Sequence, residues 1–431
     1  MTILVIVLFI IFAVTLALGI PIYASLGITS ISAQFIDPSF PATSTFIFRN
    51  LITTIDVQSM LAVPLFILSG IIMAKGGISR KLFDFFAYFM GTLTGGLPIA
   101  TIITCLFYGA ISGSAPATVA AVGAMCIPIL TELGYNYTFV TAMVTVAGSL
   151  GVIIPPSIPF IMFGLATGVS VGDLFIAGIV PGILIALCLI IYAVYYCKKH
   201  GEDKEKLAEN ARKLREGGFI RVLKDSIWAL LSPVIILGGI YGGFVTPTEA
   251  AGVSVIYALI VSMLIYRTVN FKSLVSMLIE SAGTVAPIML IVSAASVFGR
   301  VLTMSSAPQI FTQSALAVFT TKVSLLLVIN VFLLFVGMIM DTTAAILILA
   351  PILVPMVQPF GVSGLQLGVI MIVNLAIGFV TPPVGLNLYV ASSMTKLSVT
   401  NIARHAIPFI VAFIIALLII TFVPALSTML L

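Results

Sequence analysis

Charged side chains are scarce in this chain. Only 8% of its 431 residues are Asp, Glu, Lys or Arg, whereas 61% are hydrophobic. A soluble protein carries about a quarter charged residues, because water must solvate its surface. The shortage excludes an ordinary soluble globular protein and favours an all-α, multi-pass membrane protein whose partner is the lipid bilayer.

Cysteine and histidine are also scarce, with four Cys and two His. No two cysteines form a CxxC pair, and His200 and His405 are isolated, so neither a disulfide framework nor a zinc site is indicated. The chain has no GxxxxGK[ST] motif, so nothing predicts ATP hydrolysis. No nucleophile–base pair stands out among the apolar segments. These absences favour an ion-driven secondary transporter over a pump or an enzyme.

Basic residues are concentrated in one stretch. Nine of the 19 Lys and Arg lie between Lys198 and Lys224, with acidic residues interleaved. The interleaved acids argue against a nucleic-acid partner, and the position fits a cytoplasmic loop under the positive-inside rule. We predict a charged, helical cytoplasmic loop over 198–226. Its expected i,i+4 ion pairs are Glu202 with Lys206 and Glu209 with Lys213.

Long apolar segments make up most of the remainder. Segments 137–168 and 365–396 are too long for one straight helix and carry Pro-Pro in the middle, which predicts two broken helices. Three shorter amphipathic segments are typical of interfacial helices: 45–57, 79–90 and 307–320. The predicted crossings are 2–20, 21–36, 60–74, 137–168, 174–197, 227–246, 250–266, 274–303, 365–396 and 404–430.

Three short patterns recur at a nearly constant distance along the chain. The offsets are 223, 224 and 227 residues. The matching pairs are Val63-Pro64 with Ala286-Pro287, Thr118–Ala121 with Thr342–Ala345, and Pro155-Pro156 with Pro382-Pro383. An internal repeat of this kind is typical of secondary transporters.

Charge in the matching loops indicates that the repeat is inverted. The loop after Pro64 carries Lys75, Arg80 and Lys81, whereas the loop from Met304 to Pro308 carries no base. The two loops can lie on opposite faces of the membrane only if two segments do not cross it. We predict that these segments form re-entrant helical hairpins, which enter and leave the membrane by the same face. The predicted organisation is 1–60 N-terminal scaffold helices, 61–197 first repeat with a hairpin at about 95–131, 198–226 loop, 227–273 scaffold helices, and 274–431 second repeat with a hairpin at about 322–357.

Turn-forming and polar residues gather at the hairpin tips and helix breaks. Pro116 suits the first turn of a new helix, while Asp341 and Thr381 are placed to cap restarting helices. Unwound backbone offers carbonyl oxygens to a hard cation such as sodium, and helix N-termini favour an anion. We therefore expect each tip to hold one sodium ion together with its break, giving at least two sites, with the substrate between them.

The predicted sodium ligands come from both tips and both breaks: Ser112, Gly113, Ser114, Gly148, Ser149, Gly151, Ile154, Gly337, Asp341, Thr342, Gly378, Thr381 and Gly385. The predicted substrate contacts are Ser114, Ala115, Thr118, Pro156, Ser157, Thr342, Thr343, Pro383, Asn387 and Arg300.

Several polar residues allow more than one interpretation. Arg300 could bind substrate, pair with Glu280 or extend to the interface. Asn374 and Asn387 could be ligands or helix-packing groups. Thr246-Pro247-Thr248-Glu249 reads as a capping box, with a direct transport role as the alternative.

In combination, these motifs resemble the large membrane subunit of the tripartite ATP-independent periplasmic (TRAP) transporters. The matching pieces are Gly113–Ala121, Pro155–Ser157, Thr246–Ala251 and Thr381–Gly385. The resemblance implies an elevator-type transporter of the bacterial inner membrane, in which hairpins and broken helices move against a scaffold. It also implies two partners, a small TRAP membrane subunit as a separate chain and a periplasmic substrate-binding protein.

The resemblance further implies an organic acid as substrate. It leans toward sialic acid (N-acetylneuraminate), with a C4-dicarboxylate as the alternative, although no residue named above separates the two. A proton-coupled anion carrier using Asp341 and Glu249, and a channel subunit, are further alternatives. The expected activity is thus sodium-coupled symport of an organic acid, without enzymatic chemistry.

Overall fold

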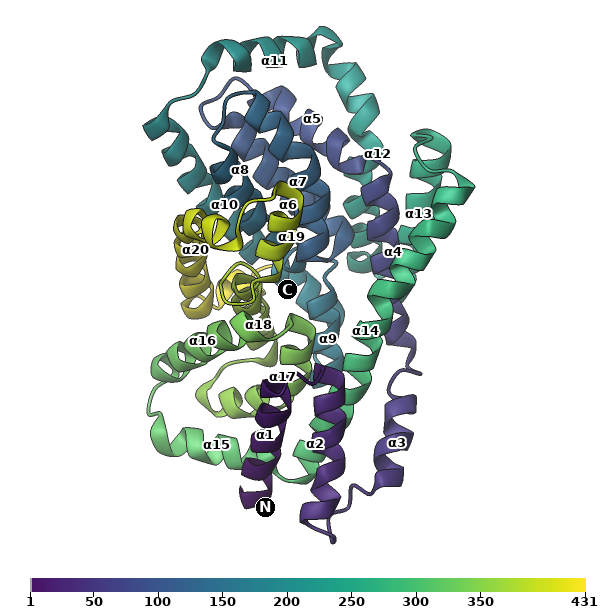
Figure 1. Cartoon of the computed structure of the whole chain (residues 1–431), viewed down its shortest axis with the longest axis vertical. Coiled ribbons are helices and arrows are strands. Elements are labelled where there is room, and N and C mark those ends of the chain that lie inside the picture. The colour runs from purple at the N-terminus through teal and green to yellow at the C-terminus, as the bar shows by residue number, and fades with distance from the viewer. Residues whose placement is uncertain (1) are drawn as a thin grey trace.

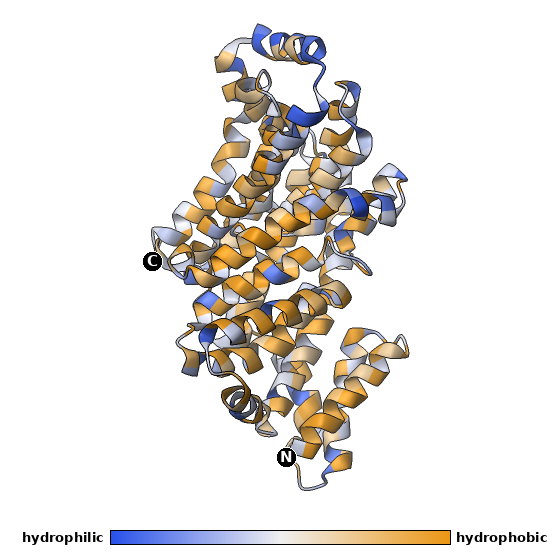
Figure 2. Cartoon of the chain, turned by 90° about the vertical axis from the view of Figure 1, so that its left-hand side faces the viewer, coloured by the Kyte–Doolittle hydropathy of each residue, from blue (hydrophilic) through white to orange (hydrophobic). Residues whose placement is uncertain are grey.

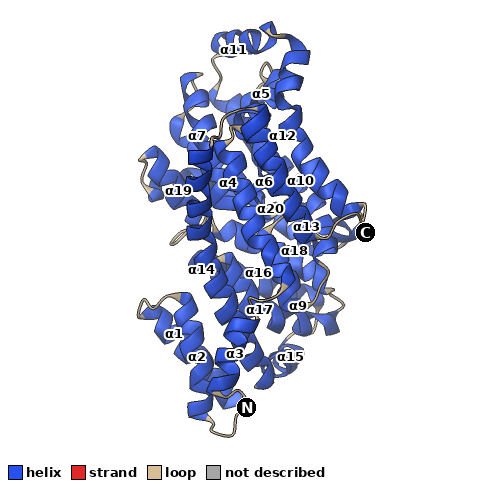
Figure 3. Ribbon diagram, turned by 90° about the vertical axis from the view of Figure 1, so that its right-hand side faces the viewer, coloured by secondary structure: helices blue, strands red, loops and turns tan. Residues whose placement is uncertain are grey.

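A computed structural model describes residues 2–431, and over this range the chain is helical and has no strand (Figure 1). Among residues 2–431, eight helices are long and apolar enough to cross a membrane. The molecule is elongated, with α5 and α11 near the upper end of Figure 1 and the N-terminus near the lower end. Figure 3, turned by 90° about the vertical axis, again shows α5 and α11 near the upper end and the N-terminus near the lower end.

The first half contains a helix–turn–helix pair followed by a broken helix. Its elements are α1 (Thr2–Ala17), α2 (Ile22–Ile36), α3 (Ser44–Thr53), a 3-10 turn (Gln58–Leu61), α4 (Ala62–Lys75), α5 (Ile78–Met90), α6 (Gly96–Ser112), α7 (Ala115–Glu132), α8 (Tyr137–Ala147), a second 3-10 turn (Gly148–Val152), α9 (Ile158–Thr167) and α10 (Val171–His200).

Three helices connect the halves. They are α11 (Lys204–Glu216), α12 (Gly218–Tyr241) and α13 (Pro247–Leu259), the last continuing through a π-helical segment (Ile260–Ile265). The predicted capping box at the start of α13 is present, because the Thr246 side chain accepts from the Glu249 amide and Glu249 accepts from the Thr246 amide at 2.8 Å. This confirms the cap interpretation of that motif.

The second half repeats the element order of α4 to α10 and ends in one further short helix. It consists of α14 (Phe271–Met304), α15 (Ala307–Val318), α16 (Lys322–Ile339), α17 (Thr342–Val357), a 3-10 turn (Gln358–Phe360), α18 (Gly364–Gly378), α19 (Leu386–Thr395), α20 (Val399–Phe422) and α21 (Ala425–Thr428). Helices α5 and α15, which follow α4 and α14 respectively, lie near opposite ends of the molecule in Figure 1. The inverted orientation of the two halves stays a prediction.

The first broken helix and the first arm of the second are the most enclosed parts of the molecule, whereas Val384, Leu386 and Tyr389 beyond the second break are exposed. Residues 139–164 are buried without interruption, and so are residues 366–380. By contrast, long apolar side chains cover the outside: Ile191, Leu264 and Phe335 are each more than 60% exposed. Such extensive apolar exposure indicates contact with lipid. Figure 2 shows hydrophilic residues concentrated at the α11 end, whereas the rest of the body is mostly hydrophobic.

The charged loop is helical, as predicted, but one of its ion pairs differs. Leu207 is buried on the inner face of α11, and Lys213 binds Glu209 at 2.7 Å. Glu202 does not pair with Lys206, because Asp203 caps α11 and takes Lys206 at 3.5 Å. Glu202 therefore precedes the helix, where i,i+4 geometry does not apply.

Glu202 instead joins the two ends of the first helix pair. Its carboxylate accepts from the Gly95 amide at 3.0 Å, just before α6 begins, and from the Tyr135 hydroxyl at 2.6 Å, just after α7 ends. Burial, followed by the adjacent Glu202, raises the pKa of Tyr135 well above its usual range. The phenol thus stays protonated and remains a donor to Glu202.

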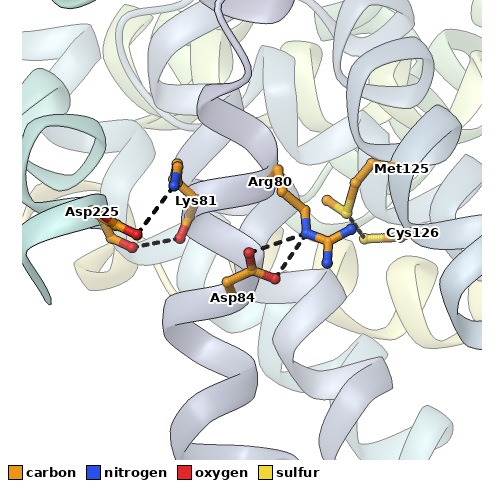
Figure 4. A network of polar contacts seen from close by, with 7 residues as sticks. Arg80, Lys81, Asp84, Met125, Cys126 and Asp225 are labelled. Carbon is orange, nitrogen blue, oxygen red and sulfur yellow. Dashed lines mark hydrogen bonds and ion pairs between the residues drawn. The ribbon is translucent and has the colours of Figure 1, made fainter. Parts of the chain in front are cut away.

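A second polar network fixes α5 at the same end (Figure 4). Lys81 binds Asp225 of α12 at 3.3 Å, and Arg80 binds Asp84 at 3.0 Å beside Cys126 of α7. Burial raises the pKa of Asp84, against the opposing effect of Arg80. Helix α5 is therefore tied to α12 on one side and lies against the first helix pair on the other.

The Glu202 contacts generate a stability prediction. Glu202→Ala removes a charged acceptor from an amide and a phenol, so we expect the apparent Tm to fall by roughly 1–3 °C. Glu205→Ala, on the exposed side of α11, is the matched control and should leave Tm unchanged. Equal melting curves for the two variants in detergent would contradict this role of Glu202.

Candidate functional site

The first tip joins α6 to α7 through two residues. Gly113 has a left-handed φ of +60°, Ser114 is extended, and Pro116 lies in the first turn of α7 as predicted. The Ser112 hydroxyl lies 3.0 Å from the Thr118 hydroxyl, which also approaches the Ser114 carbonyl at 2.8 Å. The tip is therefore a compact group of oxygen atoms.

The first break packs directly on this tip. A Cβ at Gly151 would lie 2.4 Å from the Thr118 hydroxyl oxygen and 2.7 Å from the Ser114 carbonyl oxygen, so only glycine allows the approach. Beyond the break, the Ile158 amide donates to the Gly113 carbonyl at 3.4 Å. Ser157 turns inward and donates to the Val152 carbonyl at 2.6 Å.

The second tip and break repeat this arrangement. A Cβ at Gly378 would lie 2.3 Å from the Gly337 carbonyl oxygen, so the two backbones touch. The Val384 amide donates to the Met338 carbonyl at 3.3 Å, the counterpart of the bond from Ile158 to Gly113. Asp341 caps α17 as predicted, accepting from the Thr343 amide at 2.8 Å.

Thr381 does not cap the restarting helix, which corrects the prediction. Its hydroxyl donates backwards to the Ile377 carbonyl at 2.8 Å and so satisfies the end of α18. Helix α19 begins at Leu386, after Gly385 in a left-handed conformation (φ +48°). The restart thus comes five residues after Thr381, beyond the reach of its side chain. The Pro155–Pro156 and Pro382–Pro383 bonds are both cis.

Asn387 connects the two halves. Its side-chain amide donates to the Ser149 hydroxyl at 3.1 Å and to the Thr145 carbonyl at 3.3 Å, both in the first broken helix. Asn374 points elsewhere and donates to the Asn330 side chain at 2.6 Å. The side-chain oxygens of Asn374 and Asn387 are buried without a hydrogen-bond partner among residues 2–431.

One cavity of about 650 Å³ lies between the two tips. The predicted site residues that line it are Ser112, Gly113, Ser114, Asp341, Thr342 and Thr343. The remaining predicted sodium ligands lie outside its lining, in the breaks and hairpin arms: Gly148, Ser149, Gly151, Ile154, Gly337, Gly378, Thr381 and Gly385. The predicted substrate contacts Ala115, Thr118, Pro156, Ser157, Pro383 and Asn387 also lie outside it.

Arg300 lies apart from this cavity. It is on α14 and donates to the Asn50 side chain of α3. Glu280 is on the same helix 20 residues earlier, about 30 Å away at 1.5 Å per residue, so the suggested pairing of Arg300 with Glu280 is wrong. The role of Arg300 as a substrate contact stays a prediction.

The cavity is also lined by two residues that sequence reasoning had not assigned to the site. Lys75, at the end of α4, forms an ion pair with Glu280 of α14, and both line the cavity. In the sequence analysis, Lys75 was used only to infer the membrane face on which the following loop lies. Its spacing from Ile67 and Ile71 on one helical face was the available signal.

Residues 9–426 match the family described as "Tripartite ATP-independent periplasmic transporter, DctM component". The isethionate TRAP transporter permease protein DctMQ of Oleidesulfovibrio alaskensis is 42% identical over 97% of this chain, which spans 65% of that relative's length. The C4-dicarboxylate TRAP transporter large permease protein DctM of Pseudomonas aeruginosa is 41% identical, over 88% of this chain and 87% of the relative. The sialic acid TRAP transporter large permease protein SiaM of Vibrio cholerae is 33% identical, over 89% of each chain.

Two solved transporters share the fold. The YdaH transporter of Alcanivorax borkumensis matches with a TM-score of 0.63 and 15% identity, over 95% of this chain and 96% of that one. MtrF of Neisseria gonorrhoeae matches with a TM-score of 0.54 and 14% identity, over 90% of this chain and 85% of that one. Sequence, helical architecture and apolar exterior thus agree: the chain belongs to the DctM family of TRAP transporter large permease components, multi-pass proteins of the bacterial inner membrane.

Proposed function

We propose that this chain is the large permease subunit of a sodium-coupled importer of a small organic acid anion. The observation that carries the proposal is the single cavity into which both tips open. Helices α7 and α17 begin at these tips, at Ala115 and Thr342. The positive end of a helix dipole favours an anion. The starts of α7 and α17 both flank the cavity, and at α17 the Thr343 amide is already bonded to Asp341.

The tips and breaks also suit sodium ions. At the first tip, the Ser112 and Thr118 hydroxyls and the Ser114 carbonyl lie within hydrogen-bonding distance of one another. Hard cations prefer such oxygen ligands. At the second tip, the Asp341 carboxylate adds a negative charge beside Thr342. In the proposed mechanism, sodium at both tips orders the anion site, and the loaded hairpins and broken helices then move as an elevator against the flanking helices.

The relatives and the cavity lining support a compact acid as substrate. The relatives that are 42% and 41% identical are named for isethionate and C4-dicarboxylates, and the one named for sialic acid is 33% identical. Four alanines of α7 line one wall and offer no side-chain hydrogen bond: Ala117, Ala120, Ala121 and Ala124. A sugar acid with many hydroxyls needs more polar partners than such a wall supplies. We therefore favour a C2 sulfonate or C4-dicarboxylate over sialic acid.

Family membership also supports two partners. We propose that a small TRAP membrane subunit stabilises the permease and that a periplasmic binding protein delivers the anion.

The membrane potential can supply the free energy for import. Each excess positive charge that moves inward with the substrate through 100 mV contributes about 2.3 kcal/mol, so coupling to sodium is sufficient to accumulate the anion inside.

Uptake into proteoliposomes containing both partners tests the proposed function. With sodium outside, radiolabelled isethionate or succinate should accumulate, while sialic acid competes poorly. With potassium outside at the same pH, accumulation should be lost. Undiminished uptake in potassium would refute sodium coupling, and uptake driven by a pH gradient alone would favour a proton-coupled carrier.

Asp341→Asn tests the second ion site. The amide keeps the size of the side chain but removes its charge, so we expect the sodium concentration for half-maximal uptake to rise by about tenfold or more. Asp173→Asn, in the first turn of α10, is the matched control and should not change it. An unchanged sodium titration for the Asp341 variant would remove this residue from the site.

Gly151→Ala tests the contact between the first tip and its break. The added methyl group would collide with the Thr118 hydroxyl, and overpacking of this kind costs about 1–3 kcal/mol. We expect uptake at limiting sodium to fall by at least roughly tenfold. Gly283→Ala, in α14, meets no atom within 4 Å and is the matched control. Equal uptake by the two variants would show that the close approach is dispensable.

A further inference from the structure

The cavity contains very little charge. Of the residues that line it, only Lys75, Glu280 and Asp341 are charged, so Lys75 is the single lining cation within residues 2–431. Asp341 already accepts from the Thr343 amide at the start of α17. An anion between the tips would therefore meet two carboxylates, and one ammonium group would be available to offset them.

Helix α4 brings Lys75 close to the first tip. The face of α4 toward the cavity includes Gly70 and Ala74, and a Cβ built at Gly70 would lie 3.1 Å from the Ser112 backbone. Lys75 follows Gly70 by five residues, about 7.5 Å along the helix axis. The flexible four-carbon stem of lysine lets its ammonium group move between the cavity wall and a ligand near the tip.

Glu280 competes for the same ammonium group. It shares a face of α14 with Thr284 and Ile288, which also line the cavity. The Lys75 and Glu280 side chains are 43% and 50% exposed. Because water screens an ion pair this exposed, an incoming anion can displace Glu280 at little cost. Such an exchange needs no movement of either helix.

We propose that Lys75 is the counter-ion for the anionic group of the substrate and that Glu280 is the carboxylate that the substrate displaces. The proposal rests on the proposed function, because it assumes an organic acid in this cavity. Without substrate, Glu280 holds Lys75 at the wall. With substrate bound, Lys75 turns to the carboxylate or sulfonate, and return of Glu280 to Lys75 favours release. An alternative is that the pair serves only to fasten α4 to α14.

Two neutral variants separate these roles, because they should change affinity in opposite directions. The half-saturating concentration is measured for isethionate and for succinate, both as uptake in sodium medium and as thermal shift of the purified permease. Lys75→Gln should raise it by roughly tenfold or more, since the anion loses its cation. Glu280→Gln should lower it several-fold, since the competitor is gone. Lys75→Arg should restore most of the affinity, and Lys81→Gln, whose partner is Asp225 outside the cavity, should leave it unchanged.

The outcomes are distinguishable. If both neutral variants weaken binding equally, or if Lys75→Gln binds like the wild type, the counter-ion role is overturned while sodium-driven uptake by the wild type still stands. If the wild type takes up and binds neither probe, the proposed function fails and the inference fails with it. Melting temperatures of the variants without ligand report any loss of fastening separately from affinity.

Discussion

A backbone amide or carbonyl that no helix satisfies cannot face hydrocarbon. In the described part of the chain, such groups arise at the two hairpin tips and at the two helix breaks. The structure solves the problem by packing each tip against a break: Gly151 lies on the Ser114 carbonyl, and Gly378 lies on the Gly337 carbonyl. The same amide-to-carbonyl bond then joins break to tip in each half, from Ile158 to Gly113 and from Val384 to Met338. The first broken helix and α18 are accordingly the most enclosed elements of the fold.

The same constraint accounts for the position of the candidate site. Since the tips must stay among protein atoms or line a polar cavity, the helix starts at Ala115 and Thr342 meet at one place instead of facing lipid. Asn387 adds a direct link from the second break to Ser149 in the first. The two ion sites that we propose are therefore not independent, and ordering one tip can influence the other through the shared cavity and this link.

Features encoded in neighbouring residues were predictable from the sequence. The double prolines marked the broken helices, Pro116 and Asp341 marked the starts of α7 and α17, and the T-x-x-E pattern marked the start of α13. Each depends on local backbone chemistry, which the sequence shows directly.

Contacts between distant segments were not predictable in the same way. Glu202 bonds Gly95 and Tyr135 instead of Lys206, because Asp203 caps α11 and Glu202 therefore lies outside the helix. The Thr381 hydroxyl donates to a carbonyl at the end of α18 and does not cap α19. The pairing of Lys75 with Glu280 joins residues 205 positions apart, and only the three-dimensional fold brings them to one wall.

The central claim is that sodium orders both tips against their breaks. Hydrogen–deuterium exchange of the purified permease, compared in sodium and in potassium at equal ionic strength, measures this directly. The account predicts that amides in 112–118 and in 337–343 become more protected in sodium, while α11 does not change. Identical exchange at both tips in the two salts would contradict it.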